Sequence, residues 1–332
     1  MLRTISIMAL VLSVGAALSS SPARGGDIYV VNYNGNTIGE YTTSGETVNA
    51  SLVSGLSGPW GIAVSGSNIY VDNYFAGTIG EYTTSGGTVN ASLVSGLTVP
   101  EGIAVSGSDL FVANFNADTI GEYTTSGETV NASLVSGLSG PWGIAVSGSD
   151  LFVDNYYAGT IGEYTTSGGT VNASLVSGLS NPVGIAVSGS DLFVTNEGNG
   201  KVGEYTTSGG TVNASLVSGL SYPWGIAASG SEVFVTNYPS TIGEYTTSGG
   251  TVNASLVSGL NDPVGIAVVE TPEPSTLALL AAGAVGLVGY VWRRRQVARR
   301  TAKPSDLDQQ DTSPILAFPS HSSPTSAARR AA

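Results

Sequence analysis

The sequence predicts an all-β fold, a six-bladed β-propeller of four-stranded antiparallel blades, followed by one C-terminal transmembrane helix. The first observation is a repeated Gly-Glu-Tyr whose glutamates are spaced 41, 41, 41, 41 and 40 residues apart, a period typical of propeller blades. The second is that each repeat holds four short β-like runs, and the third is how the array begins and ends. The glutamates are Glu40, Glu81, Glu122, Glu163, Glu204 and Glu244.

The strands of one blade can be assigned within residues 59–97. Strand A is predicted at 61–66 (GIAVSG), strand B at 68–73 (NIYVDN), strand C at 78–86 (TIGEYTTSG) and strand D at 88–94 (TVNASLV). Each run is β-branched or aromatic and is bounded by Gly, Ser, Asn or Pro, as strands and turns require. No run shows a 3.6-residue period, so a helical solenoid is disfavoured.

The two ends of the array predict a closed ring. The array opens with strand B at residues 27–32 and closes with strand A at residues 264–268. The C-terminal strand A is therefore predicted to join the N-terminal strands B, C and D and to complete the first blade. Closure removes the free sheet edges and stabilises a ring that has no Cys for disulfides.

Both ends of the chain read as targeting segments around the propeller of residues 27–270. Residues 1–26 are predicted to be a signal peptide, because Arg3 precedes an apolar run and then small residues. Residues 271–295 contain a predicted transmembrane helix at 277–292 that ends in arginines, which predict a cytoplasmic C-terminus. Residues 296–332 are rich in Ala, Ser, Pro and Thr and are predicted to form a disordered cytoplasmic tail.

Residues 271–295 resemble a PEP-CTERM sorting signal: a Pro-Glu-Pro motif, an apolar helix and a basic cluster, in that order. The resemblance implies an exosortase-type processing enzyme as a partner and delivery to the cell surface or the exopolysaccharide matrix. Membrane anchoring before or in place of processing is the alternative, because 37 residues follow the arginines where such signals usually end. The motif residues are Pro272, Glu273, Pro274, Arg293, Arg294 and Arg295.

The repeat residues PWGIAVSGSNIYVDN, followed by GTIGEY, resemble the NHL repeat, and LFVTN at 192–196 resembles the related YVTN surface-protein propellers. The resemblance covers about 240 residues and implies the six-bladed fold. Function varies widely on this fold, so the resemblance alone implies no activity.

The charge distribution narrows the class of partner. Residues 27–270 contain 20 acidic residues and one base, Lys201, which gives about −19. Such a body repels phosphate, so nucleic acid is not an expected partner. The charge is compatible with three other classes of partner: neutral sugars, cations and basic surfaces.

The loops that vary between repeats are predicted to lie on one face. In an antiparallel meander the B–C and D–A turns share a face, and these turns carry most of the differences between repeats. We expect them to gather an aromatic surface suited to stacking on sugar rings, and the alternative is that the aromatics pack between blades. The candidate ligand-binding residues are Trp60, Trp142, Trp224, Tyr74, Phe75, Phe115, Tyr156, Tyr157, Tyr238 and Glu101, with Tyr33 in the same set of loops.

The two repeated polar rings are interpreted mainly as structural. The glutamates lie on the third strand from the axis, and with one Lys in the ring they should be solvated or accept bonds from hydroxyls and amides. The asparagines that end strand B are expected to cap turns. No metal or cofactor is predicted. The alternative is a Ca²⁺ site to which Asp72 and Asp154 would contribute carboxylate ligands. The asparagines are Asn32, Asn73, Asn114, Asn155, Asn196 and Asn237.

Enzymes on similar propellers include streptogramin lyase and the gluconolactonase and regucalcin hydrolases. A resemblance to the lyase would imply a catalytic His, and the single His of this chain is His321, in the tail. A hydrolase would need Glu, Asn and Asp around a metal, for which Glu101 is the one non-repeat carboxylate at the channel mouth. We therefore expect an exported, non-catalytic binding protein that contacts extracellular polysaccharide. The alternatives are a protein-binding or self-associating scaffold, or a metal-dependent lactonase-like or lyase-like enzyme.

Overall fold

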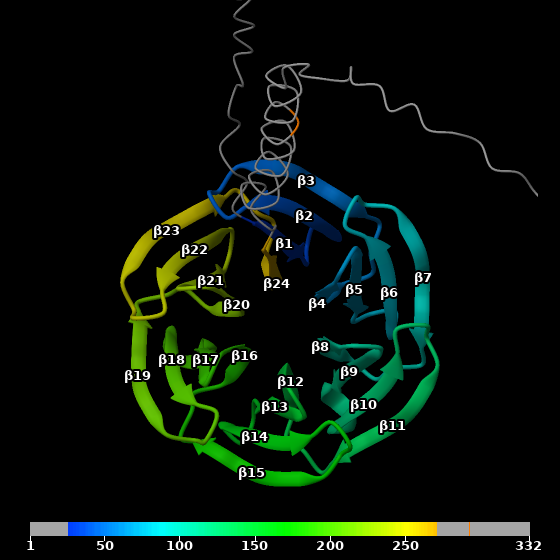
Figure 1. Ribbon diagram of the computed structural model, residues 1–332, viewed down its shortest axis with the longest axis vertical. Helices are drawn as coiled ribbons and strands as arrows, with labels where there is room; N and C mark the ends of the chain where they lie inside the picture. Colours follow the sequence, from blue (N-terminus) through cyan, green and yellow to red (C-terminus); the bar gives the residue numbers. More distant parts are fainter. Residues whose placement is uncertain (1–25, 271–291, 293–332) are drawn as a thin grey trace, which may run out of the picture. The chain divides into compact units, whose positions relative to one another are not determined.

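The structure is a computed structural model that describes residues 26–270 and Trp292. Six four-stranded antiparallel sheets are arranged around a central axis as the blades of a propeller (Figure 1). The innermost strands are β4 (Pro59–Ser65), β8 (Pro100–Ser106), β12 (Pro141–Ser147), β16 (Pro182–Ser188), β20 (Pro223–Ser229) and β24 (Pro263–Val269). The predicted all-β, six-bladed propeller of four-stranded antiparallel blades is confirmed.

The remaining strands follow outward in chain order. The second strands are β1 (Asp27–Asn32), β5 (Asn68–Asn73), β9 (Asp109–Asn114), β13 (Asp150–Asn155), β17 (Asp191–Asn196) and β21 (Glu232–Asn237). The third strands are β2 (Thr37–Thr42), β6 (Thr78–Thr83), β10 (Thr119–Thr124), β14 (Thr160–Thr165), β18 (Lys201–Thr206) and β22 (Thr241–Thr246). The outermost strands are β3 (Thr47–Ser54), β7 (Thr88–Ser95), β11 (Thr129–Ser136), β15 (Thr170–Ser177), β19 (Thr211–Ser218) and β23 (Thr251–Ser258). Two short 3-10 helices, η1 (Phe115–Ala117) and η2 (Glu197–Asn199), lie between second and third strands.

The first blade is closed by the two ends of the array, as predicted. Its strand order is β24-β1-β2-β3, and β24 pairs antiparallel with β1 through partners that include Ile28 with Val268 and Val30 with Ile266. We number the blades from this one, so that blades 2 to 6 begin with β4, β8, β12, β16 and β20.

The core lies between the blades in six similar clusters. One of them joins Phe111 and Ile120 of blade 3 to Ile144, Leu151 and Tyr164 of blade 4. The aromatic on each second strand is almost fully buried; it is Tyr29, Tyr70, Phe111, Phe152, Phe193 and Phe234 in blades 1 to 6. Alternate residues of a strand point to opposite faces, so each blade buries both of its faces against its two neighbours.

The Gly-Glu-Tyr motif has a packing explanation. The ring of Tyr41 lies back over Gly39 on the same strand, and a Cβ at Gly39 would be 2.7 Å from Tyr41 Cε2. All six repeats show this arrangement, and each tyrosine is buried. Three of the glutamates, Glu40, Glu81 and Glu244, are buried, so the second arm of the expectation, hydrogen bonds from neighbouring groups, is the one that applies to them. Glu81 Oε1 accepts a hydrogen bond from Asn68 Nδ2 at 3.0 Å, so part of this ring is satisfied by neighbouring amides.

Several asparagines that end the second strands cap a loop, but it is the loop before the innermost strand and not, as the sequence suggested, the turn that follows the asparagine. Asn73 Oδ1 accepts a hydrogen bond from Ser57 N–H at 3.2 Å, and Asn155 and Asn196 make the same bond to Ser139 and Ser180. Each bond fixes the loop that enters the innermost strand of the same blade. It therefore positions the residues that reach the axis.

The targeting segments fall almost entirely outside the described residues. The predicted signal peptide, the Pro-Glu-Pro motif, the arginines and the tail all belong there, and of the predicted transmembrane segment only Trp292 is described. Within the described part of the chain, no helix has the length and apolar character that crossing a bilayer requires.

The glycines of the innermost strands form a ring around the axis, where adjacent blades come too close to admit a side chain. A Cβ at Gly102 would overlap the carbonyl oxygen of Trp142 in the next blade, and backbone cannot move aside as a flexible side chain can. Gly102→Ala is expected to lower the free energy of unfolding by at least about 2 kcal/mol, measured by urea denaturation. The control is Gly87→Ala in an exposed turn, where other repeats carry Glu46 and Glu128, and it should change stability by less than about 0.5 kcal/mol. Equal effects of the two changes would contradict the prediction.

Candidate functional site

Three tryptophans meet at the axis on one face of the ring. Trp60, Trp142 and Trp224 are the second residues of the innermost strands of blades 2, 4 and 6. Their ring centroids are 4.9 Å apart for Trp60 and Trp224, and 5.8 Å apart for each of the other two pairs. The three indoles therefore pack against one another across the channel mouth, each only partly exposed. We call this group the tryptophan triad.

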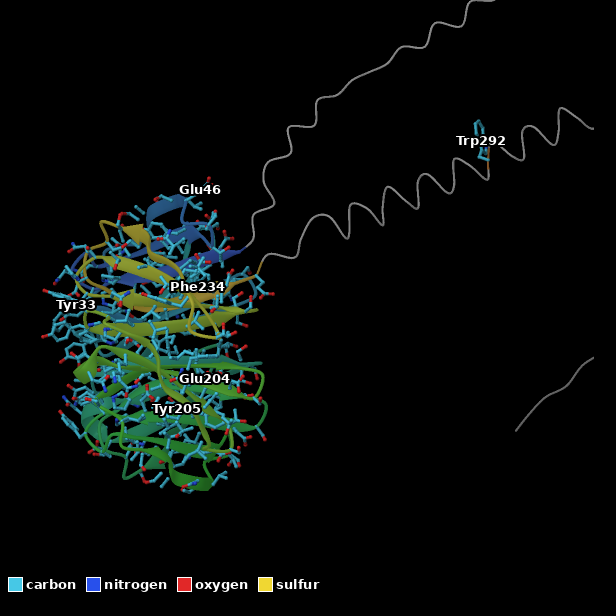
Figure 2. The ribbon with its side chains drawn as sticks, turned by 90° about the vertical axis from the view of Figure 1, so that its left-hand side faces the viewer. Tyr33, Glu46, Glu204, Tyr205, Phe234 and Trp292 are labelled. Atoms are coloured by element: carbon cyan, nitrogen blue, oxygen red, sulfur yellow. The ribbon has the colours of Figure 1, made fainter. Side chains whose placement is uncertain are left out.

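Further aromatic side chains surround the triad. Tyr33 stands edge-on to Trp60 at 4.9 Å, and Tyr74 lies 6.2 Å from the same ring. Around Trp142, Phe115 and Tyr156 lie at 5.1 Å and 5.0 Å. Figure 2 shows Tyr33 at one flat side of the propeller. The expectation that these loop residues gather on one face agrees with these contacts. The same contacts show that the three tryptophans pack against one another and against the loop aromatics, which is what the alternative of aromatic packing expects of them.

The channel beneath the triad is narrow. It holds a cavity of about 80 Å³, lined by the second, third and fourth residues of all six innermost strands. These are the residue that follows the proline, the ring glycine and an isoleucine, as in Trp60, Gly61 and Ile62. Pockets that enclose drug-sized ligands have volumes of about 300–1,000 Å³. The channel is therefore too small to enclose a ligand of that size.

Glu101 occupies in blade 3 the position that tryptophan or valine occupies in the other blades. Its side chain is 6% exposed, and its Oε2 has no hydrogen-bond partner among the described residues. Burial, together with the nearby Asp72 carboxylate, raises the pKa of Glu101 to about 9. Glu101 is therefore protonated at neutral pH. Its sequence position at the channel mouth agrees with the prediction, and its depth does not follow from the sequence.

Polar side chains near the ring glycines connect adjacent blades. Thr195 Oγ1 donates to the carbonyl oxygen of Trp224 in the next blade at 2.6 Å, and Thr236 Oγ1 donates to that of Val264 at 2.7 Å. In blades 2 and 4 the same strand position holds Asp72 and Asp154. The two hydroxyls therefore act as hydrogen-bonded links between blades.

Asp72 and Asp154 are completely buried, and burial raises the pKa of each carboxyl well above its ordinary value. Asp72 Oδ1 accepts a hydrogen bond from Gly61 N–H at 2.9 Å, whereas both oxygens of Asp154 lack a partner among the described residues. The two residues lie on different blades. Within residues 26–270, no three Asp, Glu, His or Cys side chains are grouped so that they could hold a metal ion. The Ca²⁺ possibility stays a prediction from the sequence.

The structure shows two features of the site that the sequence analysis did not predict. Tyr222, in the loop before β20, is 57% exposed and stands edge-on to Tyr238 at 6.1 Å. Its position in a variable D–A loop, next to Pro223, was an available signal. Trp224 Nε1 is buried without a partner among the described residues, and no sequence pattern predicts which way an indole turns.

The sequence profile of the virginiamycin B lyase family matches residues 12–238 and 68–287. Among curated proteins, no sequence matches this chain. A chain of the nidogen/laminin complex is similar in structure at 18% identity and a TM-score of 0.62, over 74% of this chain and 98% of that one.

Two lyase structures are also similar. A streptogramin B lyase matches at 24% identity and a TM-score of 0.56, over 74% of this chain and 88% of that one. A catalytically inactive His-to-Ala variant of virginiamycin B lyase from Staphylococcus aureus, with quinupristin, matches at 23% identity and a TM-score of 0.53, over 65% and 75% of the two chains. At these identities the structural similarities show the fold alone.

The buried acid at the mouth gives a prediction about pH. The pKa of Glu101 is raised from its ordinary value of 4.5 to about 9, so between these pH values the folded chain holds a proton that the unfolded chain has released. Stability should therefore fall as pH rises through this window, and Glu101→Gln should reduce the fall and make the protein more stable than wild type at pH 8.

The measurement is urea denaturation from pH 4.5 to 9.5. Asp154 contributes a slope of the same sign in both proteins, so the difference between wild type and variant reports on Glu101 together with its coupling to Asp72. The control is Glu128→Gln, which removes an exposed carboxylate from the same blade. Parallel pH curves for wild type and Glu101→Gln would refute the assignment.

Proposed function

This chain belongs to the virginiamycin B lyase family, and from the residues at its channel mouth we propose that it is a non-catalytic, polysaccharide-binding protein of the cell surface or extracellular matrix. The observation that carries the proposal is the concentration of aromatic side chains on one face, centred on the triad. Aromatic rings stack on the apolar faces of sugars, and exposed amides beside them offer hydrogen bonds. Asn34 and Asn116 are such exposed amides in the same loops.

The charge of the propeller supports a neutral or cationic polysaccharide. Residues 27–270 carry about −19, and their only base, Lys201, donates to Ser215 on the outermost strand of blade 5. At the mouth, Glu197 accepts a hydrogen bond from Tyr156 at 3.4 Å, and Asp262 accepts one from Asn34 at 3.0 Å. Acidic polymers would be repelled from such a surface.

The targeting segments support the cellular address. A signal peptide at 1–26 and a sorting signal at 271–295 would export the propeller and hand it to an exosortase-type enzyme, with membrane anchoring through residues 277–292 before or in place of processing. Delivery to the surface would bring the aromatic face into contact with extracellular polysaccharide.

Family membership makes lyase activity the second candidate. The Staphylococcus aureus variant that lacks one histidine is catalytically inactive. In this chain the propeller has no histidine, since the single one is His321. Of the oxygen acids at the mouth, Tyr156 donates to the Glu197 carboxylate at 3.4 Å, whereas Glu101 Oε2 has no partner among the described residues, so Glu101 lacks the paired base that an activated nucleophile needs.

Glycan binding tests the first candidate. Full-length Trp292→Phe protein leaves Trp60, Trp142 and Trp224 as its only tryptophans, so its emission reports on the mouth. We expect saturable change of this emission with at least one of chitohexaose, cellohexaose and laminarihexaose, and none with alginate, an acidic control. If no neutral glycan binds and light scattering shows self-association, the scaffold alternative replaces the proposal.

Turnover of a streptogramin tests the second candidate. We expect no linear product when quinupristin is incubated with the protein and divalent cations and the mixture is followed by mass spectrometry, because the propeller lacks a histidine. Product formation that Glu101→Gln abolishes and Glu128→Gln preserves would establish an enzyme and overturn the non-catalytic proposal.

A further inference from the structure

The most exposed aromatic side chains of the propeller are not the tryptophans. Phe75 is 68% exposed, Tyr157 is 69% exposed, Tyr222 is 57% exposed and Tyr238 is 45% exposed. Phe75 lies in the β5–β6 loop of blade 2 and Tyr157 in the β13–β14 loop of blade 4. Tyr222 and Tyr238 lie in the loops before β20 and after β21, in blade 6. The exposed rings thus occupy every second blade.

Phe75 and Tyr157 are held in nearly identical surroundings. Each stands edge-on to the preceding tyrosine, at 5.1 Å from Tyr74 and 5.3 Å from Tyr156. Each ring lies over the glycine that precedes the innermost strand, so that a Cβ at Gly140 would be 2.7 Å from Tyr157 Cδ2, and one at Gly58 would overlap Phe75. Both are therefore rings fixed on one side by packing and open to solvent on the other.

Backbone hydrogen bonds fix the two loops in the same way. The N–H of Phe75 donates to Ser57 O at 3.2 Å, and the N–H of Tyr157 donates to Ser139 O at the same distance. Asn36 and Asp118, each from the preceding blade, accept the N–H of Gly58 and Gly140 at 3.0 Å and 2.8 Å. A ring held in one orientation loses little conformational entropy when a ligand stacks on it.

Blade 6 also exposes aromatic rings in these loops, but it does so with different residues. Tyr222 takes the position of Gly58 and Gly140, with the same left-handed backbone at a φ of 44°, and stands edge-on to Tyr238. In blades 1, 3 and 5 the residue that corresponds to Phe75 is Asn34, Asn116 or Gly198, all exposed. The aromatic positions are thus separated by polar or small ones.

We propose that this face carries three separate sugar-stacking platforms, Phe75, Tyr157 and the Tyr222–Tyr238 pair, and that it engages one neutral polysaccharide at several points. The inference rests on the proposed function and deepens it. The tryptophan triad closes the channel and supports the platforms through Tyr74 and Tyr156, while the exposed rings contact the sugar. A polymer with identical units can occupy several platforms at once, which raises its apparent affinity far above that of one platform.

The test compares polymer and oligomer binding by full-length protein. The probes are immobilised chitin, cellulose and β-1,3-glucan, together with the corresponding soluble hexasaccharides. The variants are Phe75→Ala, Tyr157→Ala and the double change Tyr222→Ala/Tyr238→Ala, alone and combined. Removal of one platform should weaken polymer binding at least tenfold, removal of two should reduce it to the affinity of the hexasaccharide, and removal of all three should abolish it.

A matched control removes exposed apolar side chains of the same blades elsewhere. Val89→Ala/Val171→Ala/Val252→Ala changes the outermost strands β7, β15 and β23, and it should leave binding unchanged. Unfolding midpoints of all variants show whether the fold is intact. Loss of all binding after removal of one platform would indicate a single site, and unchanged binding after removal of all three would place the ligand elsewhere. Either result overturns the inference and leaves the proposed function standing, whereas no binding of wild type to any probe overturns both.

Discussion

The close approach of six innermost strands at the axis is the constraint on which the rest of the structure depends. A side chain at the ring glycine of one blade would meet backbone of the next blade: a Cβ at Gly102 would overlap the carbonyl oxygen of Trp142, and one at Gly265 would overlap that of Trp60. Because these strands touch backbone to backbone, the residue that precedes each glycine is directed at its counterparts on the other blades. The tryptophan triad and the narrow channel both follow from this contact.

The same contact explains why the repeat alternates. Three indoles already meet at the axis with centroids 4.9–5.8 Å apart, so the mouth has no room for six. The intervening positions accordingly hold Glu101, Val183 and Val264, which are smaller and buried. A sixfold scaffold thus acquires a threefold mouth, and a unit of two blades is the smallest repeat that can build it. The exposed aromatic rings of the loops have this same two-blade spacing.

The sequence was sufficient for the fold and for which loops share one face, because both depend on spacing. A period near 41 residues, four strand-like runs and the split first blade determine the number of blades, the closure and which turns share a face. Depth and direction of side chains depend instead on the radius of the ring and on side-chain rotation. The mutual packing of the three tryptophans, the burial of Asp72 and Asp154 and the exposure of Tyr222 therefore required coordinates. The repeated glutamates show the same limit, since identical letters are buried in Glu81 and half-buried in Glu163.

Glu101 breaks the threefold arrangement and makes one third of the mouth unlike the others. Valine at the equivalent positions, Val183 and Val264, buries its side chain without leaving a polar atom unpaired, whereas Glu101 keeps a carboxyl group in a site that raises its pKa to about 9. Burial of a polar group without a partner costs about 1–3 kcal/mol. Asp72 stands near Glu101 in the adjacent blade 2, so two buried carboxyl groups lie close together at this part of the mouth. The two matched loops that carry Phe75 and Tyr157 flank this same sector, in blades 2 and 4. The channel mouth is therefore asymmetric: two of the three positions between the tryptophans hold valine, and the third holds a protonated acid.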